Sequence, residues 1–501
     1  MEEKKSVKKN FIYNLIYQVF LIIVPVVVTP YVSRVLGPAQ IGQYSYSYSI
    51  ISYFVLFAAL GFAYYAQREV AKFQNDKEEQ SKIFWEICIV RLISTLISFV
   101  ILIGISFIPF FNDYRTLLLI LSLNVFSTCI DTTFIFSGNE DFKQIALRNF
   151  VAKALIIISI FVFVKSKNDL WIYTLIQGVS PIISSLFMIP FLKKYLVKIN
   201  LKELKPKRHV IPCLKLFVPT IAVSIYTMLD KTMIGSMIQG EITIIEDGVE
   251  VVKKISDLES GYYNQAEKIV KLLITIVTSL GTVMIPRNSY CFANGDLVSA
   301  KKNVMTGLRF AYLLAFPLMF GVIAVSYNFS PWFFGDGYEK VPFLMQVFSP
   351  LILAIGLNNV LGIQYLIPSS RDNQYTISVV IGAGTNLILN AILINFYGSV
   401  GAAISTVCAE FIILFVQLFF LRKDITLLNV ISSGWKYFVA GIVMFIPCYI
   451  VGLKLSSSIL NTLIIVVIGI FVYGIMLLIL KDEFIYSILG KLKRKKNNNE
   501  K

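Results

Sequence analysis

The sequence is poor in the residues that build metal and redox sites. Its 501 residues include one histidine, His209, and six cysteines that stand far apart and form no CxxC pair. Zinc sites and disulfide frameworks need closely spaced or paired ligands. We therefore expect no metal site, no disulfide and no cofactor, and no special role for His209 in its basic loop.

Charged residues are also scarce. They make up 15% of the chain, whereas a soluble domain carries about 25%. Hydrophobic residues make up 56%, or about 280 residues, which is what fourteen spans of about 20 residues require. The net charge of +16 lies in short loops between apolar runs, which argues against nucleic acid as a partner.

The apolar runs predict an all-α polytopic membrane protein with about fourteen transmembrane helices. The predicted spans are 11–36, 42–66, 83–108, 116–138, 148–164, 171–192, 213–238, 259–284, 304–327, 341–366, 375–396, 400–421, 434–454 and 459–480.

The loops between these spans predict the orientation. With the N-terminus inside, about 31 lysines and arginines fall on the inner side and about 6 on the outer side, which fits the positive-inside rule. Both termini are therefore predicted to be cytoplasmic. The basic segments 193–215 and 491–496 are expected to contact anionic membrane lipids.

Short motifs recur along the chain and predict an internal repeat. Residues 35–44 are similar to residues 233–263, where the second copy carries an insertion, and residues 138–142 are similar to 370–374. Six spans separate the copies, so they run in parallel, as in transporters whose two halves face a central cavity. We predict six-helix lobes at 1–200 and 201–425 in a pseudo-twofold arrangement, with an additional helix pair and basic tail at 426–501.

Ionisable residues inside spans indicate where function resides, because each charge in lipid costs about 3 kcal/mol. The bases that we expect to bind an anion are Lys268, Lys271, Lys231, Arg34 and Arg91. The acids that we expect to couple ions or form salt bridges are Asp230, Glu267, Glu410 and Asp131.

Lys268 and Lys271 share one face of a helix, where like charges repel unless an anion or an acid lies between them. An anion site and an internal salt-bridge network with Asp230 both fit this pattern. Glu267 lies about 100° away and is expected to pair with a neighbouring helix such as span 7.

Tyrosines give a second indication of function. Tyr44 and Tyr48 share a helix face, with Tyr46 elsewhere. They fit either an aromatic belt at the outer membrane surface or a polar cavity wall suited to sugars.

Several motifs resemble those of the Wzx-type polysaccharide repeat-unit flippases of bacteria. The motifs are Leu36-Gly37-Pro38, Leu229-Asp230-Lys231, the run from Gly261 to Glu267, Ile285-Pro286-Arg287, Arg371-Asp372, and the run from Gly398 to Ala403. These flippases belong to the superfamily that also holds multidrug antiporters and lipid II flippases.

The resemblance implies flipping of undecaprenyl-diphosphate-linked oligosaccharide from the inner to the outer leaflet of the cytoplasmic membrane by alternating access, for surface polysaccharide such as capsule. It implies coupling to a proton or sodium gradient. Tyr262, Tyr263 and Asn264 are expected to face sugars with Tyr44 and Tyr48, and the additional spans to offer a groove for the lipid tail. We expect a monomer that works beside a polysaccharide polymerase and assembly proteins.

Rival functions are less compatible with the sequence. A multidrug antiporter commonly has an acid in its first helix, whereas the only charge in 11–36 is Arg34. A membrane polymerase or glycosyltransferase would place catalytic residues on a sizeable outer loop, and the longest one, 239–258, has no histidine or paired catalytic motif. We therefore expect no enzyme activity. A lipid II flippase remains a close alternative.

The paired lysines give a first prediction. Replacing Lys268 and Lys271 together by alanine should abolish surface polysaccharide, because the diphosphate would lose its cations. Polymer and membrane-inserted protein are both measured in the producing cells. Normal polymer at normal expression would contradict the anion-site hypothesis.

Overall fold

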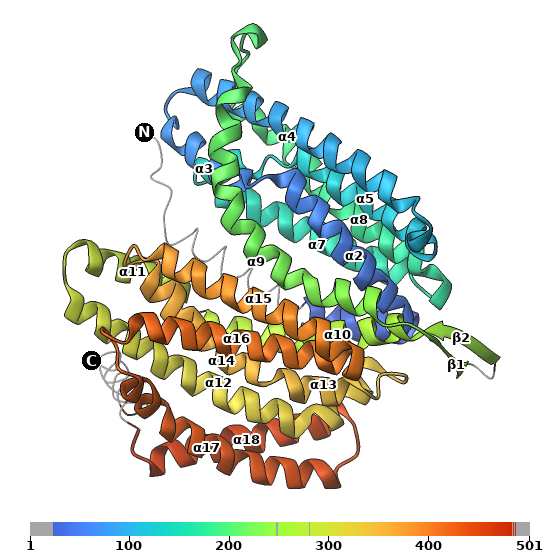
Figure 1. Ribbon diagram of the computed structural model, residues 1–501, viewed down its shortest axis with the longest axis vertical. Coiled ribbons are helices and arrows are strands. Elements are labelled where there is room, and N and C mark those ends of the chain that lie inside the picture. Colours follow the sequence, from blue (N-terminus) through green and yellow to red (C-terminus); the bar gives the residue numbers. More distant parts are fainter. Residues whose placement is uncertain (1–23, 247–248, 280, 483, 485, 487–501) are drawn as a thin grey trace, which may run out of the picture. The chain divides into compact units, whose positions relative to one another are not determined.

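The computed structural model describes residues 24–246, 249–279, 281–482, 484 and 486 (Figure 1). These residues are almost entirely helical, apart from a single two-stranded antiparallel sheet. The predicted all-α fold is thus confirmed. The start of the first span and the basic tail at 491–496 lie outside the described residues.

The chain forms two compact units, 1–261 and 262–501. Within the described residues, the first unit begins with the helix Val24–Leu36. It continues with α2 (Pro38–Ala59), α3 (Phe62–Lys72), α4 (Lys77–Ser106), η1 (Pro109–Tyr114), α5 (Arg115–Ile130), α6 (Thr133–Gly138), α7 (Phe142–Phe163), η2 (Lys167–Asp169), α8 (Leu170–Leu186), η3 (Ile189–Lys194), η4 (Leu201–Glu203), η5 (Pro206–His209), α9 (Val210–Met237), β1 (Glu241–Glu246) and β2 (Val249–Lys254).

Helix α10 (Ile255–Thr278) begins in the first unit and continues into the second. The second unit then contains α11 (Gly281–Ala293), α12 (Leu297–Phe334), α13 (Val341–Phe348), α14 (Pro350–Asn358), the π-helix η6 (Asn359–Leu366), α15 (Asp372–Tyr397), α16 (Ser399–Leu421), α17 (Leu427–Lys454) and α18 (Ile459–Ile479).

Helix α9 packs against α2 and α3, and the hydroxyls of Ser49 and Thr232 are 2.9 Å apart, so α9 lies in the first compact unit. Helices α17 and α18 pack against α12 within the second unit. The lobes 1–200 and 201–425 and the additional helix pair stay predictions.

Ten described helical stretches have the length and composition to cross a membrane. They match ten of the predicted spans, and the count of fourteen remains a prediction. The other four predicted spans are 11–36, 42–66, 213–238 and 259–284. The first is described only from Val24. Helix α2 carries tyrosines and serines and α10 carries charges, which lower their hydropathy. Several side chains of α9 lie outside the described part of the chain.

The loops 138–142 and 370–374, which are similar in sequence, have the same backbone geometry. The Asp141 amide donates to the Phe136 carbonyl and the Arg371 amide to the Leu366 carbonyl, each at 2.9 Å. In each loop the preceding residue, Glu140 or Ser370, has a positive φ, 57° and 59°. Each helix therefore ends in the same left-handed cap.

The recurring glycines Gly42 and Gly261 meet each other where α2 and α10 begin. A Cβ on Gly42 would overlap the Asp257 carbonyl oxygen and lie 2.9 Å from the Gly261 nitrogen. A Cβ on Gly261 would overlap the Pro38 carbonyl oxygen. Backbone thus packs directly on backbone, which only glycine permits.

This crossing predicts a strong stability effect. Gly42→Ala and Gly261→Ala should each lower the free energy of unfolding by about 2 kcal/mol or more, because backbone atoms must separate. Thermal unfolding in detergent measures the effect. Gly104→Ala in α4 is the matched control, because its Cβ would meet open space. Equal melting temperatures for all three variants would contradict the crossing.

A buried hydrogen-bonded network holds the connector between α8 and α9 against α4. The Glu86 carboxylate accepts from the Lys205 amide at 2.6 Å and from Arg208 Nε at 2.7 Å. It also lies 2.7 Å from His209 Nε2, while Tyr65 Oη lies 2.7 Å from His209 Nδ1. His209 is only 3% exposed. The expectation that it has no special role is therefore wrong, since it links three segments.

Burial lowers the pKa of His209 below its ordinary value, despite the opposing effect of Glu86. The neutral ring then donates from Nε2 to Glu86 and accepts at Nδ1 from Tyr65. Because the folded-state pKa is below the unfolded one, the stabilising contribution is full above pH about 6.5 and is lost as the pH falls through the folded-state pKa.

We therefore expect His209→Phe to cost about 1–3 kcal/mol at pH 8, because it removes two buried hydrogen bonds. The difference in melting temperature from the unaltered protein should shrink below pH about 6.5. Lys207→Ala, at an exposed neighbouring position, should show no such trend. A pH-independent difference for His209→Phe would show that the histidine acts only by packing.

Candidate functional site

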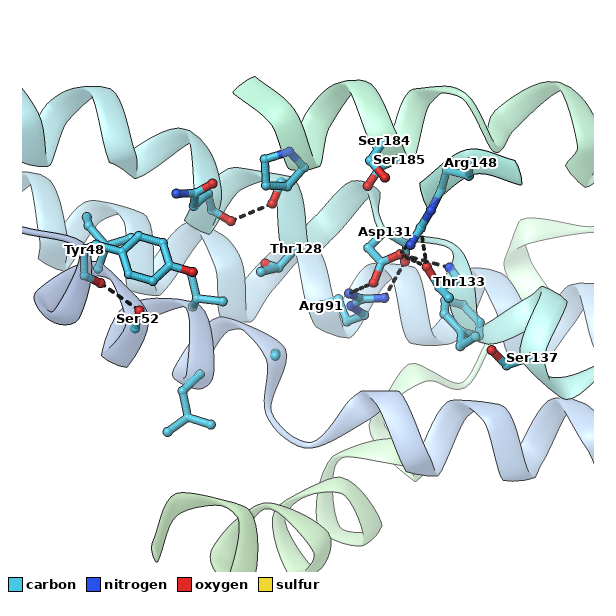
Figure 2. Close-up of a pocket in the computed structure, with 18 of the residues that line it drawn as sticks. Tyr48, Ser52, Arg91, Thr128, Asp131, Thr133, Ser137, Arg148, Ser184 and Ser185 are labelled. Carbon is cyan, nitrogen blue, oxygen red and sulfur yellow. Dashed lines mark hydrogen bonds and ion pairs between the residues drawn. The ribbon is translucent and has the colours of Figure 1, made fainter. Parts of the chain in front are cut away.

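The first unit contains a polar cavity of about 680 Å³ (Figure 2). Residues of α2, α3, α4, α5, α6, α7, α8 and α9 line it, and they include two arginines, one aspartate and many hydroxyl groups. The polar lining residues include Tyr48, Ser52, Gln67, Arg91, Asn124, Ser127, Thr128, Asp131, Thr133, Ser137, Arg148, Ser184 and Ser185.

A break in the helix brings the aspartate into this cavity. Helix α5 ends at Ile130 and α6 starts at Thr133, so Asp131 and Thr132 are not helical. The Asp131 carboxylate accepts from the Thr133 amide at 3.0 Å and caps the start of α6. Non-helical backbone at membrane depth is tolerated where it lines a wet cavity or is buried in protein.

Two arginines approach Asp131 from different helices, and Figure 2 shows both side chains directed toward it. Arg91 on α4 donates to the Asp131 carbonyl at 2.6 Å, and its guanidinium lies 3.8 Å from the carboxylate. Arg148 on α7 donates to the Thr133 hydroxyl at 2.6 Å and lies 3.6 Å from the same carboxylate. The short bonds therefore go to neutral acceptors, and the ion pairs are longer than the usual 2.7–2.9 Å or so.

This cluster carries one net positive charge, because two guanidinium groups face a single carboxylate. The Arg91 and Arg148 side chains are 8% and 13% exposed, whereas that of Asp131 is 42% exposed. The Asp131 carboxylate is thus the most accessible group of the cluster, and an anion entering the cavity would meet it first. An anion can take over its role beside the arginines, in a setting where water screens charge poorly.

Buried polar atoms beside the cluster, two donors and one acceptor, lack a partner among the described residues. Arg91 Nε and both side-chain polar atoms of Asn124 are buried and make no hydrogen bond among the described residues. Leaving such a group unsatisfied costs about 1–3 kcal/mol. A ligand or water in the cavity would complete these bonds.

Hydroxyl groups cover much of the remaining wall. Ser52, Ser127 and Thr128 donate to carbonyls of their own helices at 2.7, 2.7 and 2.8 Å. Their oxygens keep acceptor capacity toward the cavity. A ligand rich in hydroxyls therefore finds acceptors here.

Tyrosines of α2 extend this wall. Tyr48 lines the cavity, and its ring stacks on Tyr44 at 5.8 Å, so the two share a face as predicted. Tyr44 also meets the edge of Tyr173 at 4.9 Å. Tyr46 points elsewhere and packs on Tyr114.

The predicted acids and bases of α9 lie in the first unit, and those of α10 lie in the second. Asp230 is buried and Lys231 half-buried on α9. On α10, Glu267 pairs with Lys271 at 2.6 Å, one turn along the same helix. Residues four apart on a helix lie within ion-pair reach, and the expected pairing of Glu267 with a neighbouring helix stays a prediction. Lys268 is half-buried.

The other predicted site residues belong to the helix Val24–Leu36 and to the second unit. Arg34 is exposed on the helix Val24–Leu36. Glu410 on α16 is buried and accepts from the Asn358 amide at 2.8 Å. Tyr263 is fully buried against Phe348, which makes it a packing residue of the second unit. Tyr262 and Asn264 are half-buried.

Sequence reasoning placed Arg91, Asp131 and Tyr48 among the site residues but missed Arg148 and Asn124. The predicted fifth span began at residue 148, which put Arg148 at the membrane surface. Helix α7 begins at Phe142 instead, so Arg148 lies about 9 Å along the helix from its start. The polar first turn of α7 was the signal for an earlier start.

The second unit contains an apolar cavity of about 690 Å³, lined by residues of α10, α12, α13, α17 and α18. Its lining includes Gly321 and Gly474, around which a Cβ would meet only open space. Its lining contains no lysine or arginine. It therefore suits a hydrocarbon chain and offers no charge to a polar group.

Within the part of the chain that the structure describes, no three histidine, cysteine, aspartate or glutamate side chains group closely enough to hold a metal ion. All six cysteines are free thiols.

Residues 7–292 match a protein family described as "Polysaccharide biosynthesis protein", and residues 246–342 match a second family of the same description. A protein of Escherichia coli (strain K12) named "Putative O-antigen transporter" is 23% identical over 432 residues, which cover 84% of this chain and 98% of that protein.

Two solved structures share the fold at low sequence identity. A lipid II flippase, MurJ, in an inward closed conformation has a TM-score of 0.61 and 15% identity, covering 92% of this chain and 99% of that one. An inward-facing multidrug resistance MATE family transporter has a TM-score of 0.61 and 14% identity, covering 85% of this chain and 96% of that one.

Proposed function

The chain belongs to the polysaccharide biosynthesis protein family, and we propose that it flips undecaprenyl-diphosphate-linked oligosaccharide from the inner to the outer leaflet of the bacterial cytoplasmic membrane. It is a multi-pass membrane transporter and not an enzyme, like the relatives it matches. Transport by alternating access, a monomeric state, cytoplasmic termini and work beside a polysaccharide polymerase and assembly proteins are parts of the proposal.

The cluster of Arg91, Arg148 and Asp131 is the observation that carries this proposal. A diphosphate carries about two negative charges in a hydrogen-bonding head, and guanidinium groups bind phosphate through paired N–H donors. With Asp131 still charged, the cluster offers one net positive charge, and displacement or protonation of Asp131 would offer two. The site can thus strengthen its hold on the diphosphate when the acid moves aside.

The rest of the wall supports a glycan as cargo. The hydroxyls of α5 and α8 and the ring of Tyr48 lie in the same cavity as the arginines. Sugars present hydroxyls around a weakly apolar ring, which suits hydroxyl acceptors and tyrosine rings. The apolar cavity of the second unit, at the additional helix pair, supports the expectation that these helices accommodate a lipid tail.

Coupling to a proton or sodium gradient needs an acid that changes its state. Asp131 combines an exposed carboxylate with contact to both arginines, and we propose it as the first coupling acid. Asp230 and Glu410 are buried and remain proposed coupling acids. Glu267 pairs with Lys271, so we propose a salt-bridge role for Glu267. We also propose that Lys268, Lys231 and Arg34 contact the anion in addition to Arg91. Tyr44, Tyr262 and Asn264 remain proposed sugar contacts.

The arginine pair gives the test of function. Arg91→Gln combined with Arg148→Gln should weaken binding of a diphosphate-linked oligosaccharide by about 10–100-fold for each charged hydrogen bond lost. Flipping in reconstituted vesicles should fall to background. Vesicles loaded with a fluorescent lipid-linked oligosaccharide report transport as the label becomes accessible to an external quencher.

Asp131→Asn and Arg115→Gln serve as comparisons. Asp131→Asn should bind the diphosphate more tightly, because the competing carboxylate is gone, yet flip it more slowly. Arg115, which donates to the Ser106 carbonyl outside the cavity, should tolerate replacement by glutamine. Unchanged flipping by the double arginine variant would refute the proposal, and transport of organic cations instead would identify a multidrug antiporter.

A further inference from the structure

We infer that a groove between α7 and α8 holds the isoprenoid segment next to the diphosphate, with the phosphate at Arg148. This inference rests on the proposed function and adds the path by which the lipid part of the substrate lies on the first unit. The groove has a volume of about 310 Å³. Its lining includes Arg148, Val151, Leu155, Ile183, Ser184 and Leu186.

The groove and the polar cavity are joined at two residues. Arg148 and Ser184 line both of them. The Arg148 guanidinium reaches the Thr133 hydroxyl in the cavity, while its aliphatic stem can lie along apolar surface, as long basic side chains do. The only cation of the groove lining is thus also part of the anion cluster.

Apart from Arg148 and Ser184, the groove is apolar and opens toward the side where lipid is expected. Leu155, Ile183 and Leu186 line it and are 46%, 44% and 49% exposed. Helix α7 is the least buried of the ten candidate spans. Exposed aliphatic side chains on such a helix contact hydrocarbon chains.

The depth of Arg148 suits a lipid phosphate. The residue lies about 9 Å along α7 from its start, at the end of the helix that the positive-inside rule predicts to be cytoplasmic. Long basic side chains near helix ends reach toward the headgroup level. A phosphate can therefore meet Arg148 without crossing the apolar middle of the membrane, while its chain stays in the groove.

A prenyl diphosphate fits this arrangement better than an ordinary phospholipid. Its single chain can place the segment next to the diphosphate in this groove, and its roughly two negative charges match the two guanidinium groups once Asp131 is displaced or protonated. A phospholipid has two chains and a single phosphate diester charge. The apolar cavity of the second unit has no basic residue in its lining, so it cannot position a phosphate.

Filling the groove tests the inference. Val151→Trp should weaken binding of undecaprenyl diphosphate by about tenfold, because the lost contact with a few methylene groups is worth about 0.8 kcal/mol each, and leave inorganic pyrophosphate binding unchanged. Binding is measured on the full chain in nanodiscs. Leu155→Trp is a second groove variant in case the first unfolds. Val162→Trp is the matched control, because Val162 is 54% exposed on the same helix and lies outside the groove.

The Arg148 variant and the groove variants together distinguish a failure of the groove inference from a failure of the proposed function. Arg148→Gln should weaken both probes. If it does so but both groove variants bind both probes normally, the groove inference is wrong and the proposed function stands. If Arg148→Gln changes neither probe, the anion site and the proposed function fail.

Photocrosslinking identifies the occupant directly. A benzoylphenylalanine at Leu155 should capture the prenyl chain, and one at Val162 should not. Capture of phosphatidylglycerol in preference to undecaprenyl diphosphate, when both are present in the nanodisc, would show a general lipid contact and overturn the inference.

Discussion

The interruption of the helix at Asp131 is the constraint on which the cavity of the first unit depends. In a continuous helix the Asp131 carbonyl would accept from a backbone amide of its own helix, and Arg91 would lose its closest acceptor. The Thr133 hydroxyl, which accepts from Arg148, is placed by the same break. Two buried guanidinium groups are thus held by neutral oxygens, and their charge remains largely available to a ligand.

Most of the fold was predictable because apolar runs of about 20 residues have few alternatives in a membrane. The repeated glycines were also visible, and Gly42 and Gly261 meet where backbone touches backbone. The packing of α9 on α2 and α3 was not predictable, since it depends on contacts far apart in sequence. Among the predicted spans, those of α2 and α10 have low hydropathy because they carry tyrosines, serines and charges in their interiors.

The candidate site was partly predictable for a related reason. Arg91 and Asp131 stood out as charges within apolar runs. Arg148 did not, because the polar first turn of α7 hid the true start of that helix. The contact of His209 with Glu86, 123 residues away, depends on tertiary packing, and no local pattern encodes it. The pairing of Glu267 with Lys271, by contrast, follows the four-residue spacing on one helix.

The connector between α8 and α9 illustrates what such contacts change. Residues 193–209 contain seven lysines and arginines, and composition alone would mark them as a linker open to trypsin-like proteases. Cleavage requires a segment that can open locally. The Glu86 carboxylate accepts from the Lys205 amide and from Arg208 Nε, and it contacts His209. Lys82 also pairs with Glu203 at 3.1 Å. The connector is therefore a poor place to insert a tag and a protease-resistant part of the first unit.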